Sequence, residues 1–210
     1  MTRIASPAVF VVDDDAILRE AIRTLLVSVG HYVETFSSVE EFTLQRDKAR
    51  ASCLVLDVRL PGISGLEFQK LLYAAGDPIP TIFISGHGDI PMAVQAIKGG
   101  GLEFLMKPFR DQELLDAVQT AMRRDQERRE SEHLLSEVLE RYSSLTVRER
   151  EIMALVVRGQ INKQIAAATN LSEVTVKIHR GQVMRKMNAA SLPDLVRMAD
   201  KLEKASVCAR

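Results

Sequence analysis

The sequence predicts two domains: a doubly wound α/β domain with a five-stranded parallel sheet, followed by an all-α domain. In the first 120 residues, short apolar runs alternate five times with longer amphipathic stretches. This alternation is typical of a parallel sheet that helices cover on both faces. After Ser144 the apolar residues follow helical spacing throughout. The chain has 210 residues and a hydrophobic fraction of 46%, which is enough to build cores for two small domains.

The five apolar runs are the expected strands. They are Val9–Val12, Tyr32–Phe36, Cys53–Leu56, Thr81–Ile84 and Leu102–Met106. Helical patterns lie between and after them: the first carries Ile17, Ala21, Leu25 and Val29 and stops at Gly30, and the others cover 38–46, 64–74, 90–98 and 111–122. In such folds ligands bind beyond the carboxyl ends of the strands, where the strand order reverses.

The net charge of zero conceals a division along the chain. Residues 1–122 carry 11 basic and 16 acidic side chains, residues 123–143 carry 5 and 6, and residues 144–210 carry 12 and 6. A basic domain suits a polyanion such as DNA, because neutralising phosphates requires concentrated Lys and Arg. We expect an acidic regulatory domain over 1–122, a linker over 123–143 and a DNA-binding domain over 144–210.

The expected linker has no Pro or Gly between Arg123 and Arg141, which predicts one continuous helix. It carries an apolar stripe made of Leu134, Leu135, Val138, Leu139 and Tyr142. The stripe packs either on a neighbouring domain or against the same helix of a second subunit, and the sequence leaves both open. Further on, Thr146 and Glu149 have the spacing of a capping box that starts the next helix.

Several other classes of protein are excluded by the composition. No apolar run reaches the roughly 18 to 20 residues that span a bilayer, and Met1–Pro7 lacks the apolar core of a signal peptide. We therefore expect a cytoplasmic protein with no membrane partner. Cys53 and Cys208 form no CxxC motif and the four histidines are scattered, so neither a disulfide nor a zinc site is expected.

Reactive side chains follow four of the five expected strands. The first strand ends in Asp13, Asp14 and Asp15, the third in Asp57, the fourth in Ser85 and the fifth in Lys107. Each alone has a structural explanation, such as a helix cap or a solvated turn, but together they fall on one edge of the sheet. Carboxylates held close together must take up protons or bind a cation, and oxygen-only ligands favour Mg²⁺. A magnesium ion, an ammonium and a hydroxyl suit a phosphoryl group.

These positions resemble the receiver domain of response regulators, which has a flavodoxin-like or CheY-like fold. The resemblance covers residues 8–122. It is carried by Val12-Asp13-Asp14, Leu56-Asp57, Leu60-Pro61-Gly62 with Gly65, Ser85-Gly86, Phe104 and Lys107-Pro108-Phe109.

That resemblance implies a role for each residue. Asp57 would be phosphorylated by a sensor histidine kinase, and Asp13, Asp14, Asp57 and the backbone carbonyl of Arg59 would hold Mg²⁺ or Mn²⁺. Lys107 would pair with the phosphoryl oxygens and Ser85 would hydrogen-bond to one of them, although threonine is commoner there. Phe104 would swing inward when Ser85 moves. The Lys107-Pro108 bond would be cis.

Residues 162–181 have the spacing of a helix-turn-helix. A short helix is expected over Lys163–Ala168, a turn over Asn170–Ser172 and a second helix from Glu173 to about Met187. One side of the second helix carries Val176, His179, Val183 and Met187, and the opposite side carries Val174, Lys177, Ile178, Gly181 and Arg185. A buried side opposite a basic, partly apolar side is typical of a helix in the DNA major groove, where Ile178 meets a thymine methyl and Lys177 a base edge or phosphate.

The C-terminal part resembles the LuxR-type output domain, and the whole chain resembles the FixJ branch of the NarL/FixJ response regulators. The motifs are Leu145 to Glu151, Gly159, Asn162-Lys163, Ile165-Ala166, Thr175-Val176-Lys177, His179-Arg180, Lys186-Met187, Ser191-Leu192 and Asp194 to Arg197. The candidate DNA-binding residues are Lys163, Thr175, Lys177, Ile178, Arg180 and Arg185. The resemblance implies promoter DNA and RNA polymerase as partners, a homodimer on phosphorylation, and no enzyme activity beyond the chain's own phosphoryl transfer and slow dephosphorylation.

An alternative hypothesis is an enzyme. Asp13-x-Asp15 after the first strand also resembles the nucleophile motif of haloacid-dehalogenase-type Mg²⁺-dependent phosphohydrolases. That hypothesis leaves Asp57 and the basic domain unexplained. A third possibility is a DNA-binding protein whose acidic pocket no longer switches.

Overall fold

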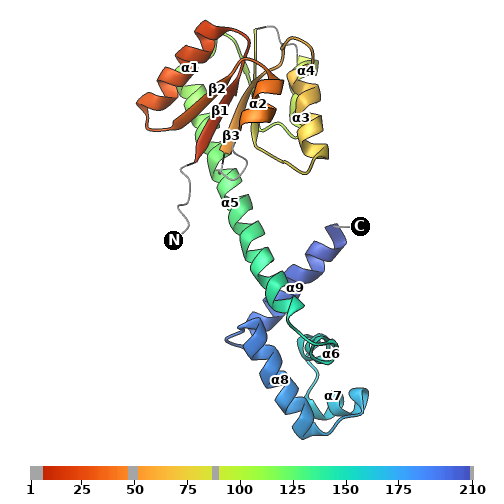
Figure 1. Cartoon of the computed structure of the whole chain (residues 1–210). Coiled ribbons are helices and arrows are strands. Elements are labelled where there is room, and N and C mark those ends of the chain that lie inside the picture. The colour runs from red at the N-terminus through yellow and green to blue at the C-terminus, as the bar shows by residue number, and fades with distance from the viewer. Residues whose placement is uncertain (1–6, 47–51, 87–89, 209–210) are drawn as a thin grey trace. The chain divides into compact units, whose positions relative to one another are not determined.

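The computed structural model describes residues 7–46, 52–86 and 90–208 (Figure 1). The chain divides into two compact units, Met1–Arg129 and Glu130–Arg210, and each is described by itself.

The N-terminal unit contains a five-stranded parallel sheet, as the sequence predicts. Its strands are β1 (Ala8–Val12), β2 (Tyr32–Phe36), β3 (Ser52–Asp57), β4 (Thr81–Ser85) and β5 (Glu103–Met106), in the order β2-β1-β3-β4-β5. All four strand pairs are parallel. The order reverses between β1 and β3, so the crevice at their carboxyl ends is where this fold binds ligands.

Helices cover both faces of the sheet (Figure 1). They are α1 (Ala16–Ser28), α2 (Val39–Gln45), α3 (Gly65–Ala74), α4 (Ile90–Lys98) and α5 (Asp111–Ser143). Alternate residues of β1 point to opposite faces: Phe10 packs with Phe42 and Phe68 of α2 and α3, whereas Val11 packs with residues of α1 and α5. Strands buried on both faces need an unbroken apolar run, and β1 and β3 have one.

The apolar pattern predicted the position of α1 correctly but not its buried face. Ile17 is 84% exposed and Val29 51% exposed, whereas Ile22 and Leu26 are buried against the sheet. Leucine, isoleucine and valine occur on more than one side of this segment, so periodicity alone allowed two overlapping stripes. Packing against the sheet selected the stripe with Ile22 and Leu26.

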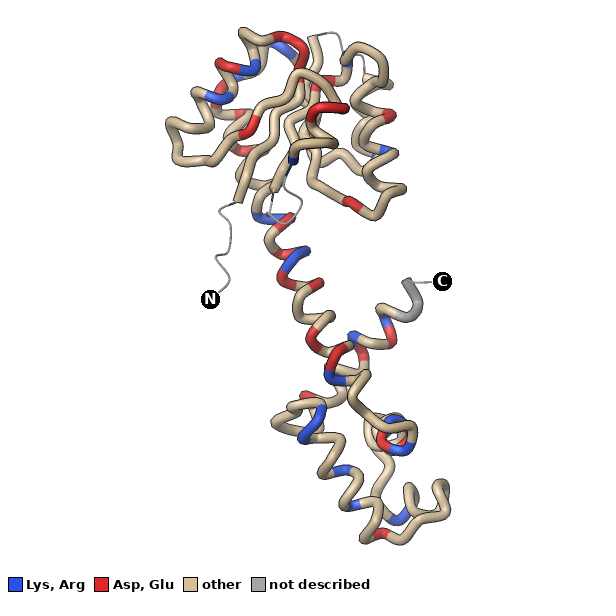
Figure 2. The backbone as a smooth tube through the Cα atoms, viewed as in Figure 1, with Lys and Arg blue, Asp and Glu red and all other residues tan. Residues whose placement is uncertain are grey.

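The helix α5 is continuous over 33 residues and includes the whole range predicted as a linker. Acidic and basic residues alternate along it in Figure 2. Within the N-terminal unit, buried Asp125 accepts a hydrogen bond of 2.7 Å from the backbone N–H of Ser52 and pairs with Arg128 and Arg129. This anchors the helix to the start of β3.

The C-terminal unit is helical. It contains the end of α5 with α6 (Val147–Val157), α7 (Asn162–Thr169), α8 (Glu173–Met187) and α9 (Leu192–Cys208). Val138 of the predicted apolar stripe is buried in its core and Tyr142 packs beside it, whereas Leu134 is 48% and Leu139 46% exposed. Packing on the neighbouring helices therefore accounts for Val138 and Tyr142.

Local signals set the helix ends of this unit. Thr146 and Glu149 form the predicted capping box at the start of α6. The turn between α7 and α8 begins at Asn170, whose left-handed backbone has a φ of 55°, and ends at Ser172, whose side chain accepts from the N–H of Thr175. Asparagine tolerates the left-handed conformation better than most residues, so this turn is encoded locally.

Gly65 is required by close packing beside Asp57. A Cβ atom there would lie 2.3 Å from the carbonyl oxygen of Asp57. We expect Gly65→Ala to lower the free energy of unfolding by about 1 to 3 kcal/mol, because the backbone must move to relieve the overlap. Urea denaturation followed by circular dichroism measures the loss. Gly86→Ala is the matched control, since a Cβ there meets nothing within 4 Å, and equal losses in both variants would contradict the explanation.

Glu149 supports the C-terminal unit through Lys186, whose Nζ lies 2.7 Å from Glu149 Oε2. The hydrogen bond from Lys186, followed by that from the backbone of Thr146, lowers the pKa of Glu149. This stabilisation is therefore present above the ordinary glutamate pKa of about 4.3 and is lost as the pH falls through the lower folded-state pKa. We expect Glu149→Gln to lose about 1 to 3 kcal/mol at pH 7. The difference from the unchanged protein should shrink below about pH 4 in thermal denaturation.

Candidate functional site

Three carboxylates meet at the carboxyl edge of the sheet. One oxygen from each of Asp13, Asp14 and Asp57 can be chosen so that all lie within 4.8 Å of one another. Asp13 is 0% and Asp57 6% exposed, whereas Asp14 is exposed. The sequence predicted this convergence, and the register explains it: Val12 of β1 pairs with Leu56 of β3, so the residue after each lies at the same edge.

Lys107 connects two of these carboxylates. Its Nζ donates hydrogen bonds of 2.7 Å to Asp13 Oδ2 and of 2.7 Å to Asp57 Oδ2. The backbone N–H of Lys107 donates to the carbonyl of Ser85 at 2.8 Å, which fixes the lysine beside β4. The bond between Lys107 and Pro108 is cis, as the resemblance implied.

Burial and charge act in opposite directions on these groups. Burial raises the pKa of Asp13, and the hydrogen bond from Lys107 only partly offsets this. Burial lowers the pKa of Lys107, but hydrogen bonds to Asp13 and Asp57, together with their charges, outweigh it and leave the pKa above its usual value. The lysine is therefore a fixed cation at neutral pH, in the position where an anionic ligand would meet it.

The residues present fit a divalent cation. Three carboxylates face one ammonium, so the cluster keeps an excess of negative charge, and all its free ligand atoms are oxygens. Such a donor set favours Mg²⁺ or Mn²⁺ over zinc or copper. Arg59 lies beside the site, and its backbone N–H donates to Asp57 Oδ1 at 3.0 Å. The metal-binding role of its carbonyl stays a prediction.

Asp15 has a different task from its two acidic neighbours. Its exposed side chain caps α1 by accepting hydrogen bonds from the N–H groups of Ile17 and Leu18. The phosphohydrolase hypothesis relied on Asp13-x-Asp15 acting as one motif. Here the second aspartate of that motif is engaged at a helix end, outside the carboxylate cluster.

The two predicted switch residues lie on neighbouring strands. Ser85 is 0% exposed at the end of β4, and Phe104 of β5 is partly buried and pairs in register with Phe83. Phe104 packs against the core cluster shared with α3 and α4. The movement of Phe104 stays a prediction.

The candidate DNA-binding residues lie on α7 and α8. Lys163, Lys177 and Arg180 line one hollow of about 620 Å³. Lys177 and Arg185 are exposed and Ile178 is 60% exposed. Thr175 lies in the first turn of α8, where its hydroxyl is 2.8 Å from that of Ser172.

The structure adds information on two side chains of α8, His179 and Arg180. His179 was interpreted as a core residue, and the structure places it as partly buried. Arg180 was assigned to DNA, and its Nη1 also donates a hydrogen bond of 2.8 Å to Asn162 Oδ1. This contact joins α8 to the start of α7. The sequence offered no signal for it, because the two residues are 18 positions apart.

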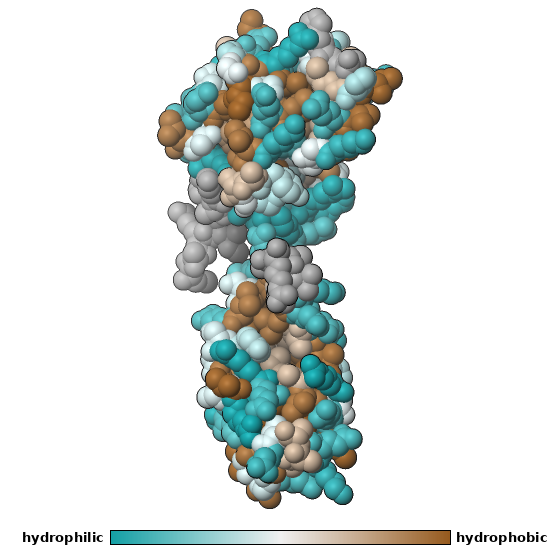
Figure 3. Space-filling model, turned by 90° about the vertical axis from the view of Figure 1, so that its right-hand side faces the viewer, coloured by the Kyte–Doolittle hydropathy of each residue, from teal (hydrophilic) through white to brown (hydrophobic). Residues whose placement is uncertain are grey.

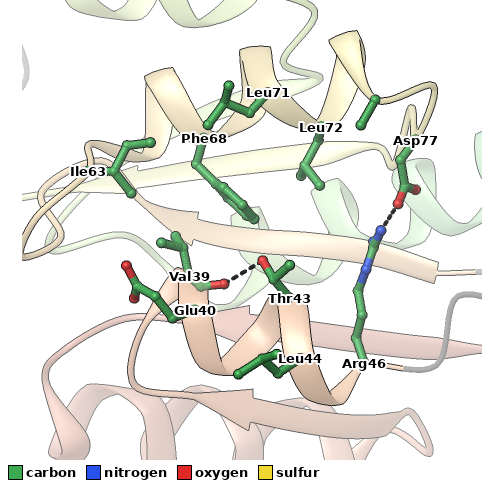
Figure 4. A pocket seen from close by; sticks show the side chains of 11 residues that line it. Val39, Glu40, Thr43, Leu44, Arg46, Ile63, Phe68, Leu71, Leu72 and Asp77 are labelled. Atoms are coloured by element: carbon green, nitrogen blue, oxygen red, sulfur yellow. Dashed lines mark hydrogen bonds and ion pairs between the residues drawn. The ribbon is translucent and has the colours of Figure 1, made fainter.

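A separate apolar pocket of about 560 Å³ lies between α2 and α3 (Figure 4). Its lining includes Val39, Leu44, Phe68 and Leu72, and it shares no residue with the carboxylate cluster. At one end Arg46 forms an ion pair with Asp77.

None of the helices in the described parts of the chain is long and apolar enough to cross a membrane. On the face drawn in Figure 3, hydrophobic residues are interspersed with hydrophilic ones.

Comparisons with known proteins agree with this geometry. Residues 9–119 match the response regulator receiver domain, and residues 143–199 match the bacterial regulatory proteins of the luxR family. The chain is 52% identical over 194 residues to nodulation protein W of Bradyrhizobium diazoefficiens, covering 92% of this chain and 86% of that protein. It is 44% identical over 191 residues to the transcriptional regulatory protein FixJ of Azorhizobium caulinodans, covering 91% and 90%. The solved structure of the response regulator StyR matches with a TM-score of 0.85 and 48% identity, covering 94% of this chain and 100% of that one.

The fold and the acidic site thus define a receiver domain joined to a helix-turn-helix domain. The chain belongs to the two-component response regulators with a LuxR-type DNA-binding domain, the group that includes FixJ. It is a transcription regulator that acts through DNA binding. The family match confirms the predicted fold class and function, and it gives no support to the phosphohydrolase alternative.

Proposed function

We propose that Asp57 accepts the phosphoryl group from a sensor histidine kinase and that the resulting phosphoaspartate controls promoter binding. The observation that carries this proposal is the contact of Asp57 with Lys107 within a cluster that also contains the carboxylates of Asp13 and Asp14. In the transfer, the bond from phosphorus to the kinase histidine nitrogen breaks and a bond to an Asp57 carboxylate oxygen forms. The carboxylate is the nucleophile, and attack by a carboxylate oxygen releases no proton, so the step needs no general base.

Each neighbouring residue has a part in that step. Asp13, Asp14, Asp57 and the carbonyl of Arg59 would hold Mg²⁺ or Mn²⁺, which would neutralise charge on the phosphoryl oxygens. Lys107 exchanges its hydrogen bond with Asp57 for one with a phosphoryl oxygen. Ser85 donates its hydroxyl to another of these oxygens. The same site hydrolyses the phosphoaspartate slowly, and we propose no other enzyme activity.

The output follows from re-packing of Ser85 and Phe104. We propose that this movement promotes a homodimer in the cytoplasm, in which two helix-turn-helix domains over about 162–181 bind paired half-sites and engage RNA polymerase. Functionally, 1–122 is the regulatory domain, 123–143 the linker and 144–210 the DNA-binding domain. Lys163, Thr175, Lys177, Ile178, Arg180 and Arg185 are the proposed DNA contacts.

The phosphorylation site is tested with acetyl phosphate and Mg²⁺. We expect Asp57→Asn to abolish labelling, because the nucleophilic oxygen is lost. Asp13→Asn should slow labelling while leaving the label on Asp57, which mass spectrometry of the phosphopeptide locates. Asp15→Asn is the control within the same acidic run and should label normally, since Asp15 caps α1. Labelling that survives loss of Asp57 and requires Asp13 as the nucleophile would overturn the proposal.

Lys177 is tested by measuring promoter affinity across a salt titration. We expect Lys177→Ala to weaken binding by about 1 to 3 kcal/mol, because an exposed cation on α8 is lost. If Lys177 contacts a phosphate, the slope of log affinity against log salt should also fall by about one. Lys201→Ala removes the same charge from an exposed position on α9 and should leave affinity nearly unchanged. Binding that does not depend on salt would exclude DNA as the partner.

A further inference from the structure

Gly181 lies in the middle of α8, in a place where nothing in the described protein requires a glycine. The residue is exposed, its φ is not positive, and a Cβ atom there would meet nothing within 4 Å. Glycine is among the least favourable residues in a helix interior. Gly181 is thus a weak helix former at the centre of a 15-residue helix, and neither its backbone conformation nor its packing requires glycine.

Most other described glycines have such a benefit. Five have positive φ: Gly30, Gly62, Gly76, Gly100 and Gly159. Three would place a Cβ against neighbouring atoms, at 2.3 Å for Gly65, 3.2 Å for Gly99 and 2.8 Å for Gly101. Gly86 shares the open surroundings of Gly181, but it lies next to Ser85 in the phosphorylation site and outside any helix.

The side of α8 that carries Gly181 is exposed and partly apolar. At 100° per residue, Val174 and Ile178 lie on the same side of α8 as Gly181, and they are 70% and 60% exposed. Lys177 and Arg185 border them and are exposed. The opposite side of the helix is buried through Val176, Val183 and Met187. The missing side chain therefore leaves an open stretch of helix surface next to Ile178 and bordered by Lys177 and Arg185, which we call the hollow.

The chemistry of this hollow selects one part of DNA. A helix with its side chains is about 10 to 12 Å wide, close to the roughly 12 Å width of the major groove, so a position without a side chain lets the backbone approach the bases. The apolar group that base pairs present in that groove is the thymine 5-methyl group. The bordering cations suit the phosphates on either side.

We propose that Gly181 is a specificity-determining position: its hollow, one turn beyond Ile178 on α8, receives the 5-methyl group of a thymine in each half-site. This proposal rests on the proposed docking of α8 in the major groove. Because Gly181 has no side chain, the backbone of α8 can approach the DNA closely at this position. Adding atoms there should therefore stabilise the free protein and weaken its complex with DNA.

The test measures thermal stability and DNA affinity in the full-length, phosphorylated protein. The DNA is a duplex that this protein selects from random sequences. We expect Gly181→Ala to raise the Tm by about 1 to 4 °C, because alanine favours the helix. The same change should weaken binding about three- to tenfold. Gly181→Lys separates close approach from simple attraction: it adds a cation, so electrostatics alone predicts tighter binding, whereas filling the hollow predicts weaker binding.

The methyl group is tested on the DNA side. Replacing thymine by uracil, one position at a time, removes only the 5-methyl group. We expect one position per half-site to lose about three- to tenfold in affinity with the unchanged protein and almost nothing with Gly181→Ala. Substitution of thymines outside the half-sites is the matched control.

The outcomes distinguish the two levels of inference. Failure of the unchanged protein to select or bind any duplex overturns the proposed DNA-binding function itself. Selection of a duplex, followed by tighter binding of Gly181→Lys or an equal uracil effect in the unchanged protein and Gly181→Ala, overturns the role of Gly181 alone. Circular dichroism of each variant confirms that the helices are intact.

Discussion

The acidic site depends on the attraction between the ammonium of Lys107 and the buried carboxylates of Asp13 and Asp57. Burial raises the pKa of Asp13, and the nearby charge of Asp57 acts in the same direction. Lys107 supplies one positive charge, 2.7 Å from each. It leaves the cluster short of further positive charge, so the same arrangement that holds the free site together also favours a divalent cation. One ammonium among three carboxylates thus accounts for the ion pairs of the free site and for its fit to a cation.

The sheet brings the charged groups of the site together. Adjacent parallel strands in register bring Asp13 and Asp57 to one edge, and β4 supplies both Ser85 and the carbonyl that fixes the backbone of Lys107. Gly65 lets α3 begin directly against Asp57, which no larger residue could allow without displacing the backbone. The side chains of the cluster are therefore attached to buried strands and the residues that follow them, while Phe104 of β5 is only partly buried.

The two units use charge in opposite ways. In the receiver unit the charged groups of the site are concentrated at one sheet edge, and Asp13 and Asp57 are buried there. In the helical unit Lys177 and Arg185 of α8 are exposed, and the opposite side of the helix is buried through Val176 and Met187. Within the receiver unit, buried Asp125 attaches α5 to the start of β3.

The sequence alone determined the strands, the helices, the acidic edge and both families, because each is encoded in local patterns or short motifs. Apolar runs specify strands, Asn170 and Ser172 specify a turn, and residues that follow parallel strands must share an edge. Only the tertiary structure decided which stripe of α1 is buried, that Asp15 caps a helix while Asp13 joins the cluster, and that Arg180 contacts Asn162. Those outcomes depend on side chains distant in sequence and on competition between alternative partners, which periodicity and spacing do not encode.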